Sequence, residues 1–254
     1  MTRPAHSSTT SPGNGLLAKL RRSFDRVFLA PMPLEAFDDY NDYWNKRPDP
    51  PLLHRYKQVA AALPEHGRVL DIGCGDGTFL AYLHSVKPQL DLYGLDISEV
   101  AIARLEARGM HGDVCDLTAE APPPDLQADH VVMMEVLEHV VEAETLIRAV
   151  GRIGAERLYV TLPNMGHIEH RLRLALGGKT PVTAIVYHIK EHVRFWTVSD
   201  FKYWADQMGY RVVRCRGQNG TLFLWRLWPS LFAMQMTYIL EKKGGSIDDQ
   251  TSHA

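Results

Sequence analysis

Glycines recur at every second position in the stretch RVLDIGCGDGTFL, residues 68–80. They are Gly73, Gly75 and Gly77, and Asp71 stands two residues before the first of them. Because an apolar strand precedes them and a helix follows, the turn places a bound group over free amides at the positive end of the helix dipole. Glycine lets the backbone approach that group closely. The stretch therefore predicts a nucleotide-type cofactor at the carboxyl end of a strand.

Apolar strands alternate with helical stretches along most of the chain, which predicts a doubly wound α/β domain. The run DHVVMMEV at 129–136 is almost entirely apolar, as is typical of a strand buried on both faces of a parallel sheet. The predicted strands are 68–73, 91–97, 110–114, 129–136, 157–164, 210–216 and 234–243. The predicted helices are 51–63, 77–86, 99–108 and 142–153, with a further one that starts at Thr197.

Composition limits the classes of protein that this chain can belong to. The net charge of −2 over 254 residues gives no general electrostatic reason to expect nucleic acid as a partner. The three cysteines, Cys74, Cys115 and Cys215, form no CxxC pair, so neither a zinc knuckle nor a disulfide framework is expected. No apolar run is long enough to span a membrane, and no secretory signal is present. We expect a cytoplasmic protein.

The chain divides into four predicted regions. Residues 1–14 form a disordered tail, 15–49 an amphipathic helix and linker, 50–243 the main domain, and 244–254 a second disordered tail. In residues 15–29, apolar side chains recur at helical spacing and basic side chains share the opposite side. Such a helix lies on an anionic membrane surface or contacts a protein partner, or else it packs on the domain itself. The oligomeric state is not predicted.

The D-x-G-x-G-x-G spacing resembles the first motif of the class I S-adenosylmethionine (SAM) methyltransferases, whereas an NAD-binding loop is spaced as G-x-G-x-x-G. The resemblance implies a seven-stranded Rossmann-like sheet with an antiparallel last strand and helices on both faces. It also implies that SAM is the cofactor. Asp71 would lie near the methionine part, and the glycines would lie under its carboxylate and ribose. An acid suits the ammonium group of SAM, and NAD offers no cation there.

The following strands continue this resemblance in order. Asp96 would accept both ribose hydroxyls, and Ile97 would pack on adenine. Asp113 and Val114 would contact the adenine edge, with Asp116 as the competing choice because the strand is short. The cofactor-binding residues implied in this way are Asp71, Gly73, Cys74, Gly75, Gly77, Asp96, Ile97, Asp113, Val114, Met134 and Glu135.

The second half of the chain resembles two neighbouring groups. The PNMGH segment at 163–167 is similar to MetW-like proteins, and EVLEH at 135–139 with HVRFWT at 192–197 is similar to UbiG-like O-methyltransferases. One implied function is methyl transfer to an oxygen of a small-molecule, glycan or lipid-linked acceptor. The alternative is a SAM-binding, non-catalytic regulatory partner of a methionine-pathway acyltransferase.

Two carboxylates and two imidazoles are candidates for the acceptor chemistry. Glu135, Glu138, His139 and the distant His192 resemble the divalent-metal site of UbiG-like enzymes and of small-RNA 2′-O-methyltransferases. The alternative without metal makes His139 a general base or an acceptor-positioning group, with Glu135 and His192 also in catalytic roles. The strip from His167 to Arg173 either binds an acidic group on the acceptor or is a solvated helix face.

Overall fold

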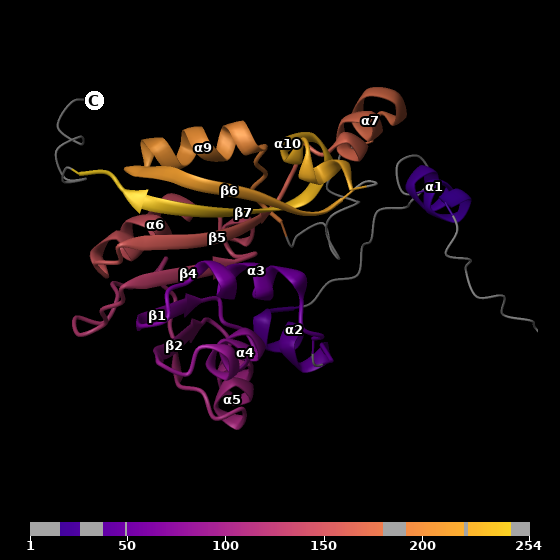
Figure 1. The fold of residues 1–254 in the computed structure, drawn as a ribbon. Helices are drawn as coiled ribbons and strands as arrows, with labels where there is room; N and C mark the ends of the chain where they lie inside the picture. Colours follow the sequence, from indigo (N-terminus) through magenta and orange to yellow (C-terminus); the bar gives the residue numbers. More distant parts are fainter. Residues whose placement is uncertain (1–15, 26–37, 49, 180–191, 221–222, 245–254) are drawn as a thin grey trace, which may run out of the picture.

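The computed structural model describes residues 16–25, 38–48, 50–179, 192–220 and 223–244. Its central feature is a seven-stranded sheet with the order β3-β2-β1-β4-β5-β7-β6 (Figure 1). The strands are β1 (Gly67–Ile72), β2 (Leu90–Asp96), β3 (Gly112–Val114), β4 (His130–Met134), β5 (Arg157–Pro163), β6 (Tyr210–Gly220) and β7 (Ala233–Lys242). The first five strands pair in parallel, and β7 pairs antiparallel with both β5 and β6.

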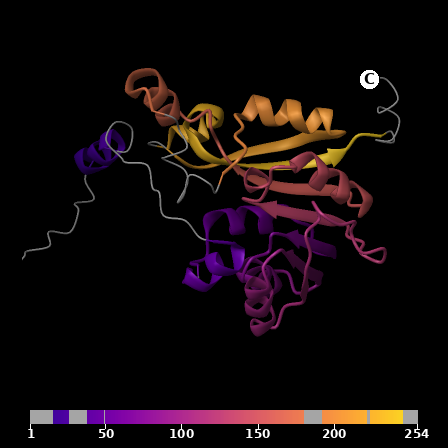
Figure 2. The same ribbon diagram turned by 180° about the vertical axis from the view of Figure 1, so that it is seen from behind.

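The helices of the described residues are α1 (Leu16–Phe24), α2 (Tyr40–Lys46), α3 (His54–Ala62), α4 (Thr78–Val86), α5 (Glu99–Ala107), η2 (Leu137–His139), α6 (Ala143–Arg152), α7 (Ile168–Gly177), α9 (Val198–Gln207), η3 (Leu224–Arg226) and α10 (Pro229–Phe232). Helices pack on both faces of the sheet, with α3, α4 and α5 on one face and α6 and α9 on the other. Both views place β6, β7 and α9 at one end of the sheet and α2 to α5 at the other (Figures 1 and 2).

Alternate residues of each strand build two separate cores, as the pleat of a β-strand requires. Val69, Val132 and Tyr159 face α3, α4 and α5 and belong to one buried cluster. Leu70 and Val131 face the other way, into a cluster that includes residues of α6 and α9. This two-sided burial explains why the central strands are apolar at nearly every position. The fold predicted from the sequence is confirmed, including the antiparallel last strand.

Local capping explains where several helices begin. The Ser98 hydroxyl accepts from the Ala101 amide at the start of α5. Thr197 and Asp200 form a reciprocal capping box at the start of α9, where the sequence predicts that a helix begins. Each cap satisfies amides that the first helical turn leaves without partners. These caps fix the ends of helices that abut the carboxyl edge of the sheet.

One segment differs from the sequence prediction. Residues 38–48, predicted as linker, contain α2, which packs against α5. The aromatic segment 223–234 contains η3 and α10, and Leu227 and Trp228 are exposed there. Residues 221–222 and the predicted tails, apart from Gly244, lie outside the described residues.

The predicted amphipathic helix is present as α1, although residues 26–29 of the predicted stretch lie outside the described residues. Leu17, Leu20 and Phe24 are exposed on it, beside the exposed Arg21 and Arg22. Its contact with a membrane or a protein stays a prediction. In the part of the chain that the structure describes, no helix is both long and apolar enough to cross a bilayer.

Candidate cofactor and acceptor site

A cavity of about 770 Å³ lies at the carboxyl ends of the parallel strands. The loops after β1, β2 and β4 line it, together with residues of α2, the start of α3, α7 and the ends of β6 and β7. This is the edge at which doubly wound sheets bind their ligands. The volume lies in the range of small-molecule and cofactor sites, roughly 300–1,000 Å³.

The glycine loop between β1 and α4 forms one wall of this cavity. Gly73, Gly75 and Gly77 have φ angles of +70°, +56° and +75°, a backbone region that disfavours side chains. A Cβ on Gly75 would lie 2.4 Å from the Trp44 ring, and a Cβ on Gly77 would lie 2.7 Å from Leu105. Gly73, Cys74 and Gly75 line the cavity, whereas Gly77 is the N-cap of α4 and packs against α5. Gly77 thus has a packing role, and the cofactor contact predicted for it stays a prediction.

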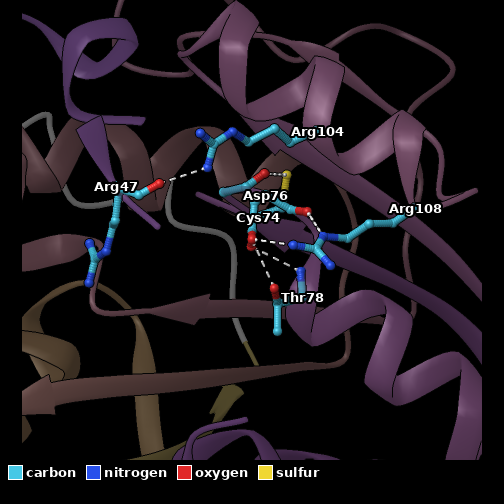
Figure 3. A network of polar contacts seen from close by, with 7 residues as sticks. Arg47, Cys74, Asp76, Thr78, Arg104 and Arg108 are labelled. Atoms are coloured by element: carbon cyan, nitrogen blue, oxygen red, sulfur yellow. Dashed lines mark hydrogen bonds and ion pairs between the residues drawn. The ribbon is translucent and has the colours of Figure 1, made fainter. Parts of the chain in front are cut away.

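Helix α5 holds the glycine loop and α2 in place (Figure 3). Arg108 donates to the backbone oxygen and the carboxylate of Asp76, both at 2.8 Å. Arg104 donates to the backbone oxygen of Arg47 at 3.0 Å. These bonds fix the loop and the segment after α2 relative to the same helix, so the cavity walls are positioned before any ligand binds.

Asp96 lies at the tip of β2 and lines the cavity, as predicted. One carboxylate oxygen accepts from the Gly75 amide and the other from the Ser98 amide, both at 2.9 Å. The side chain is 7% exposed, and burial raises its pKa. These two bonds hold the Asp96 carboxylate rigidly beside the glycine loop. A bound ribose would lie between this carboxylate and the loop.

Asp71 lies behind the cavity wall and is absent from its lining. The residue is 2% exposed, and its Oδ1 atom is buried without a hydrogen-bond partner. Burial, followed by the nearby charge of Asp96, raises the pKa of Asp71 well above its usual value. A cationic group bound nearby would favour the ionised form of this buried carboxyl group.

The end of the cavity next to β3 differs from the prediction. Asp113 is exposed and accepts from the Tyr93 hydroxyl at 2.5 Å, and Val114 is 47% exposed. Neither residue lines the cavity, which is bounded there by Ile97 and by residues 115–118. The competing choice, Asp116, lies in the lining. Its Oδ1 accepts from the amide and hydroxyl of Thr118, which orients the carboxylate.

Aromatic and basic residues before β1 form a wall that the sequence prediction missed. Tyr40, Tyr43 and Trp44 of α2 line the cavity with Arg47 and Arg55. The Arg47 guanidinium lies 4.7 Å from the Tyr43 ring centroid, and the Nε atom of Arg55 is buried without a hydrogen-bond partner. The sequence feature that could have indicated this wall is the stretch DYNDYWNKR at 39–47, in which aromatic residues lie among polar and basic ones.

Glu138, His139 and His192 come together at the other end of the cavity, as the sequence predicts. Each can offer one ligand atom to a metal ion, and these atoms lie within 4.8 Å of one another. The His139 and His192 rings are perpendicular, with centroids 4.6 Å apart. Burial and the neighbouring His139 lower the pKa of His192 to about 3, so this imidazole is neutral at physiological pH. His170 of α7 lines the cavity as well.

Two backbone hydrogen bonds and an ion pair hold His192 in this position. Both amides of the next two residues, Val193 and Arg194, donate to the backbone oxygen of Glu138. The Arg194 guanidinium then forms two bonds to the Glu144 carboxylate, at 2.6 and 2.5 Å. Trp204 of α9 also donates to Glu144 at 2.7 Å. The segment before α9 is therefore fastened to η2 and α6.

Glu135 lines the cavity but lies outside the metal-competent group. Its carboxylate accepts from the Thr161 hydroxyl at 2.8 Å and from the Gln235 amide at 3.0 Å. Its φ angle of +57° is unusual for a residue with a side chain and turns the chain away from β4. The structure thus separates Glu135 from the predicted metal ligands. Met134, predicted beside the cofactor, lines the cavity.

Comparison with known proteins gives a consistent class. A trans-aconitate 2-methyltransferase from Methylobacterium nodulans is 31% identical over 173 residues, covering 65% of this chain and 64% of the relative. A ubiquinone biosynthesis O-methyltransferase from Xanthomonas euvesicatoria pv. vesicatoria is 28% identical, covering 61% of this chain and 70% of the relative. This chain thus matches less than two thirds of the length of the first of these relatives.

The fold has solved counterparts among methyltransferases. The methyltransferase domain of bacterial CtHen1 superposes with a TM-score of 0.54 at 18% identity, covering 74% of this chain and 97% of that one. The fold and the glycine-loop site therefore define a protein of the class I SAM-dependent methyltransferase type, and SAM, the expected cofactor, is the cofactor of that class. The family model of the methionine biosynthesis protein MetW matches residues 54–240, so the chain belongs to the MetW family.

Proposed function

We propose that this protein transfers a methyl group from SAM to a hydroxyl oxygen of a small-molecule, glycan or lipid-linked acceptor. The observation that carries the proposal is that Asp96 lines the same cavity as His139 and His192, which form a cluster with the buried Glu138. Methyl transfer is an in-line displacement, so a protein contributes mainly by aligning acceptor and sulfonium and by handling the acceptor proton.

The cofactor would lie across the loops after β1 and β2. Asp96 would accept from the ribose hydroxyls, and Asp116 is better placed than Asp113 to meet adenine. Arg47 and Arg55 supply positive charge in the lining, which suits the carboxylate of the methionine part. Asp71, buried close behind, favours the ammonium group at the same end.

The acceptor would lie at the polar end of the cavity. His139, His170 and Gln235 line this end and can form hydrogen bonds with hydroxyl groups. A neutral His192 with a pKa of about 3 is too weak a base to remove a proton efficiently near pH 7. His139, which also lines the cavity, would then act as the base, and His192 would position it.

The same side chains suit a divalent cation. One buried carboxylate and two imidazoles form a mixed ligand set that magnesium, manganese or zinc accepts. Glu138, His139 and His192 would hold the ion, without Glu135. Such an ion lowers the pKa of an acceptor hydroxyl.

The match to the family of the methionine biosynthesis protein MetW supports a second candidate function. In that case the protein binds SAM and regulates a methionine-pathway acyltransferase without methyl transfer. Purification with a stoichiometric acyltransferase, together with no product from any metabolite pool, would favour this role.

Incubation with methyl-labelled SAM and a small-molecule extract tests the enzyme proposal. We expect the label in an O-methylated product, with much less in the same incubation of Asp96→Ala, whose cofactor affinity should be more than about tenfold lower. Wild-type protein that binds SAM tightly and labels nothing in polar, glycan and lipid fractions would contradict the proposal.

A further inference from the structure

A second cavity of about 200 Å³ lies between α3 and the last two strands. Its lining contains His54, Lys57, Arg214 and Arg216, and no carboxylate. It shares no residue with the lining of the large cavity. Its size is below the roughly 300 Å³ at which drug-sized pockets begin, so it suits a small ligand.

Strand register places the two arginines side by side. Arg214 pairs with Ile239 and Arg216 with Thr237, so both side chains point to the face that α3 partly covers. Residues two apart on a strand lie roughly 7 Å from each other. Lys57 approaches the same space from α3, one turn after His54.

The floor of this cavity consists of side chains that are hydrogen-bonded to one another and to the backbone. Gln58 donates to the Gly217 backbone oxygen at 3.3 Å and accepts from the Thr237 hydroxyl at 2.9 Å. These bonds tie α3 to both β6 and β7. Thr237 and Ile239 are 5% and 8% exposed and form a buried base. The basic side chains of the rim, which are those of His54, Lys57, Arg214 and Arg216, are exposed.

The charges here are not neutralised, in contrast to their neighbours. Arg211, on the same strand, pairs with Glu241, which also pairs with Arg157. Within the described residues, no ion pair forms at Lys57, Arg214 or Arg216. Like charges gathered around one space repel one another, and a bound anion would remove that repulsion.

We propose that this cavity binds a small anion bearing one or two phosphate groups. Arg214 and Arg216 would form paired hydrogen bonds with its oxygens, and Lys57 would add a point charge. The ligand is a free phosphate or pyrophosphate, or the phosphate of a small ester whose organic part extends outside the cavity. The site is separate from the proposed methyl-transfer site, so either proposal can fail alone.

Calorimetric titration of the full chain with pyrophosphate, saturated with S-adenosylhomocysteine to block the large cavity, tests this site. We expect saturable binding that sodium chloride of equal ionic strength does not reproduce. The double variant Arg214→Gln/Arg216→Gln should bind at least about tenfold more weakly, because charge-assisted bonds contribute strongly. The matched control is Arg211→Gln, which lies on the same strand outside the cavity and should bind like wild type.

Parallel titrations with inorganic phosphate and glycerol 3-phosphate distinguish a free anion from a phosphate ester. Equal pyrophosphate affinity in the double variant and wild type would overturn the proposal. So would binding of a hexaglutamate peptide without binding of any phosphate, since that result would identify a docking surface for an acidic protein segment. Circular dichroism and a melting curve confirm that the double variant is folded.

Discussion

His139 and His192 meet at right angles, with ring centroids 4.6 Å apart, although they come from opposite halves of the domain. The contact depends on Arg194, which joins the segment of His192 to Glu144 of α6. Glu138 completes the cluster from η2. The site for acceptor chemistry is thus assembled from the loop after β4 and the segment before α9.

Arg194→Gln should loosen this cluster without disturbing cofactor binding. The lost bonds to Glu144 are partly exposed, so we expect a stability loss of about 1–3 kcal/mol. Turnover should fall at least about tenfold because His192 loses its position. SAM affinity should stay within about twofold. Urea denaturation, kcat and calorimetry measure the three effects.

Arg157→Gln is the matched control for that variant. Arg157 also pairs with a glutamate, Glu241, but its side chain is 50% exposed and lies away from the cavity. We expect less than about 1 kcal/mol of destabilisation and normal turnover. A wild-type kcat in Arg194→Gln would show that the Arg194–Glu144 pair is not needed to position His192.

Cofactor affinity should depend on Asp96 and, at the adenine end, on Asp116. Loss of two ribose bonds to a carboxylate, each of about 1.5–3 kcal/mol, should weaken SAM binding by more than tenfold in Asp96→Ala. Asp116→Ala should weaken it less, and Asp113→Ala should match wild type because Asp113 points to Tyr93. Calorimetry measures the SAM affinities of the three variants. A larger loss in Asp113→Ala than in Asp116→Ala would contradict the assignment of Asp116 as the adenine contact.

Gly75 should tolerate no side chain because Trp44 already occupies the adjoining space. Gly75→Ala combines left-handed backbone strain, about 1–2 kcal/mol, with a Cβ at 2.4 Å from the Trp44 ring. Gly178→Ala isolates the strain, since Gly178 has a φ of +58° and no atom within 4 Å of its Cβ position. We expect Gly75→Ala to be the more destabilising of the two and to lose SAM affinity.

Adding Trp44→Ala to Gly75→Ala checks the cause of that loss. If the ring is responsible, the double variant should recover part of the stability lost by Gly75→Ala alone, as contacting residues show in double-mutant cycles. Strictly additive free energies of unfolding would mean that the ring does not restrict this position.

Stability of the ligand-free protein should respond to pH through Asp71. Burial raises the pKa of Asp71 in the folded state well above its usual value. The folded state therefore keeps a proton that the unfolded state releases, and stability falls as the pH rises through the folded-state pKa. We therefore compare the free energy of unfolding of Asp71→Asn with that of wild type, by urea denaturation at pH 4 and at pH 8. The difference should favour Asp71→Asn more at pH 8 than at pH 4. Asp125→Asn, on an exposed loop, is the control, and parallel pH profiles for wild type and Asp71→Asn would refute the assignment.

The sequence predicts the sheet and the cofactor edge well because both depend on periodic patterns. The central strands are buried on both faces, which leaves a continuous apolar signal, and the glycines follow β1 directly. Asp96 is found for the same reason, as the last residue of β2. These features follow from local order along the chain.

Other features depend on register or on distant contacts. Strand β3 has only three residues, too few to fix which aspartate turns inward, so Asp113 was favoured over Asp116. The α2 wall depends on docking against α5 through Asn41 and Ser98, which no periodicity reveals. The resemblance to UbiG-like metal sites groups Glu135 with Glu138, but hydrogen bonds from Thr161 and Gln235 hold the Glu135 carboxylate outside that cluster.

The most direct test of methyl transfer compares product formation and SAM affinity in the same preparations. Wild type, His139→Ala and His192→Ala are incubated with methyl-labelled SAM and the acceptor fraction, before and after exhaustive chelation with EDTA. We predict that wild type forms labelled product, that both variants form at least about a hundredfold less, and that all three bind SAM equally. If wild type loses turnover after EDTA treatment, the reaction needs a divalent ion at this site. If it keeps full turnover, His139 acts as a base without metal. Undiminished product formation by both variants would contradict the account and place the acceptor chemistry elsewhere.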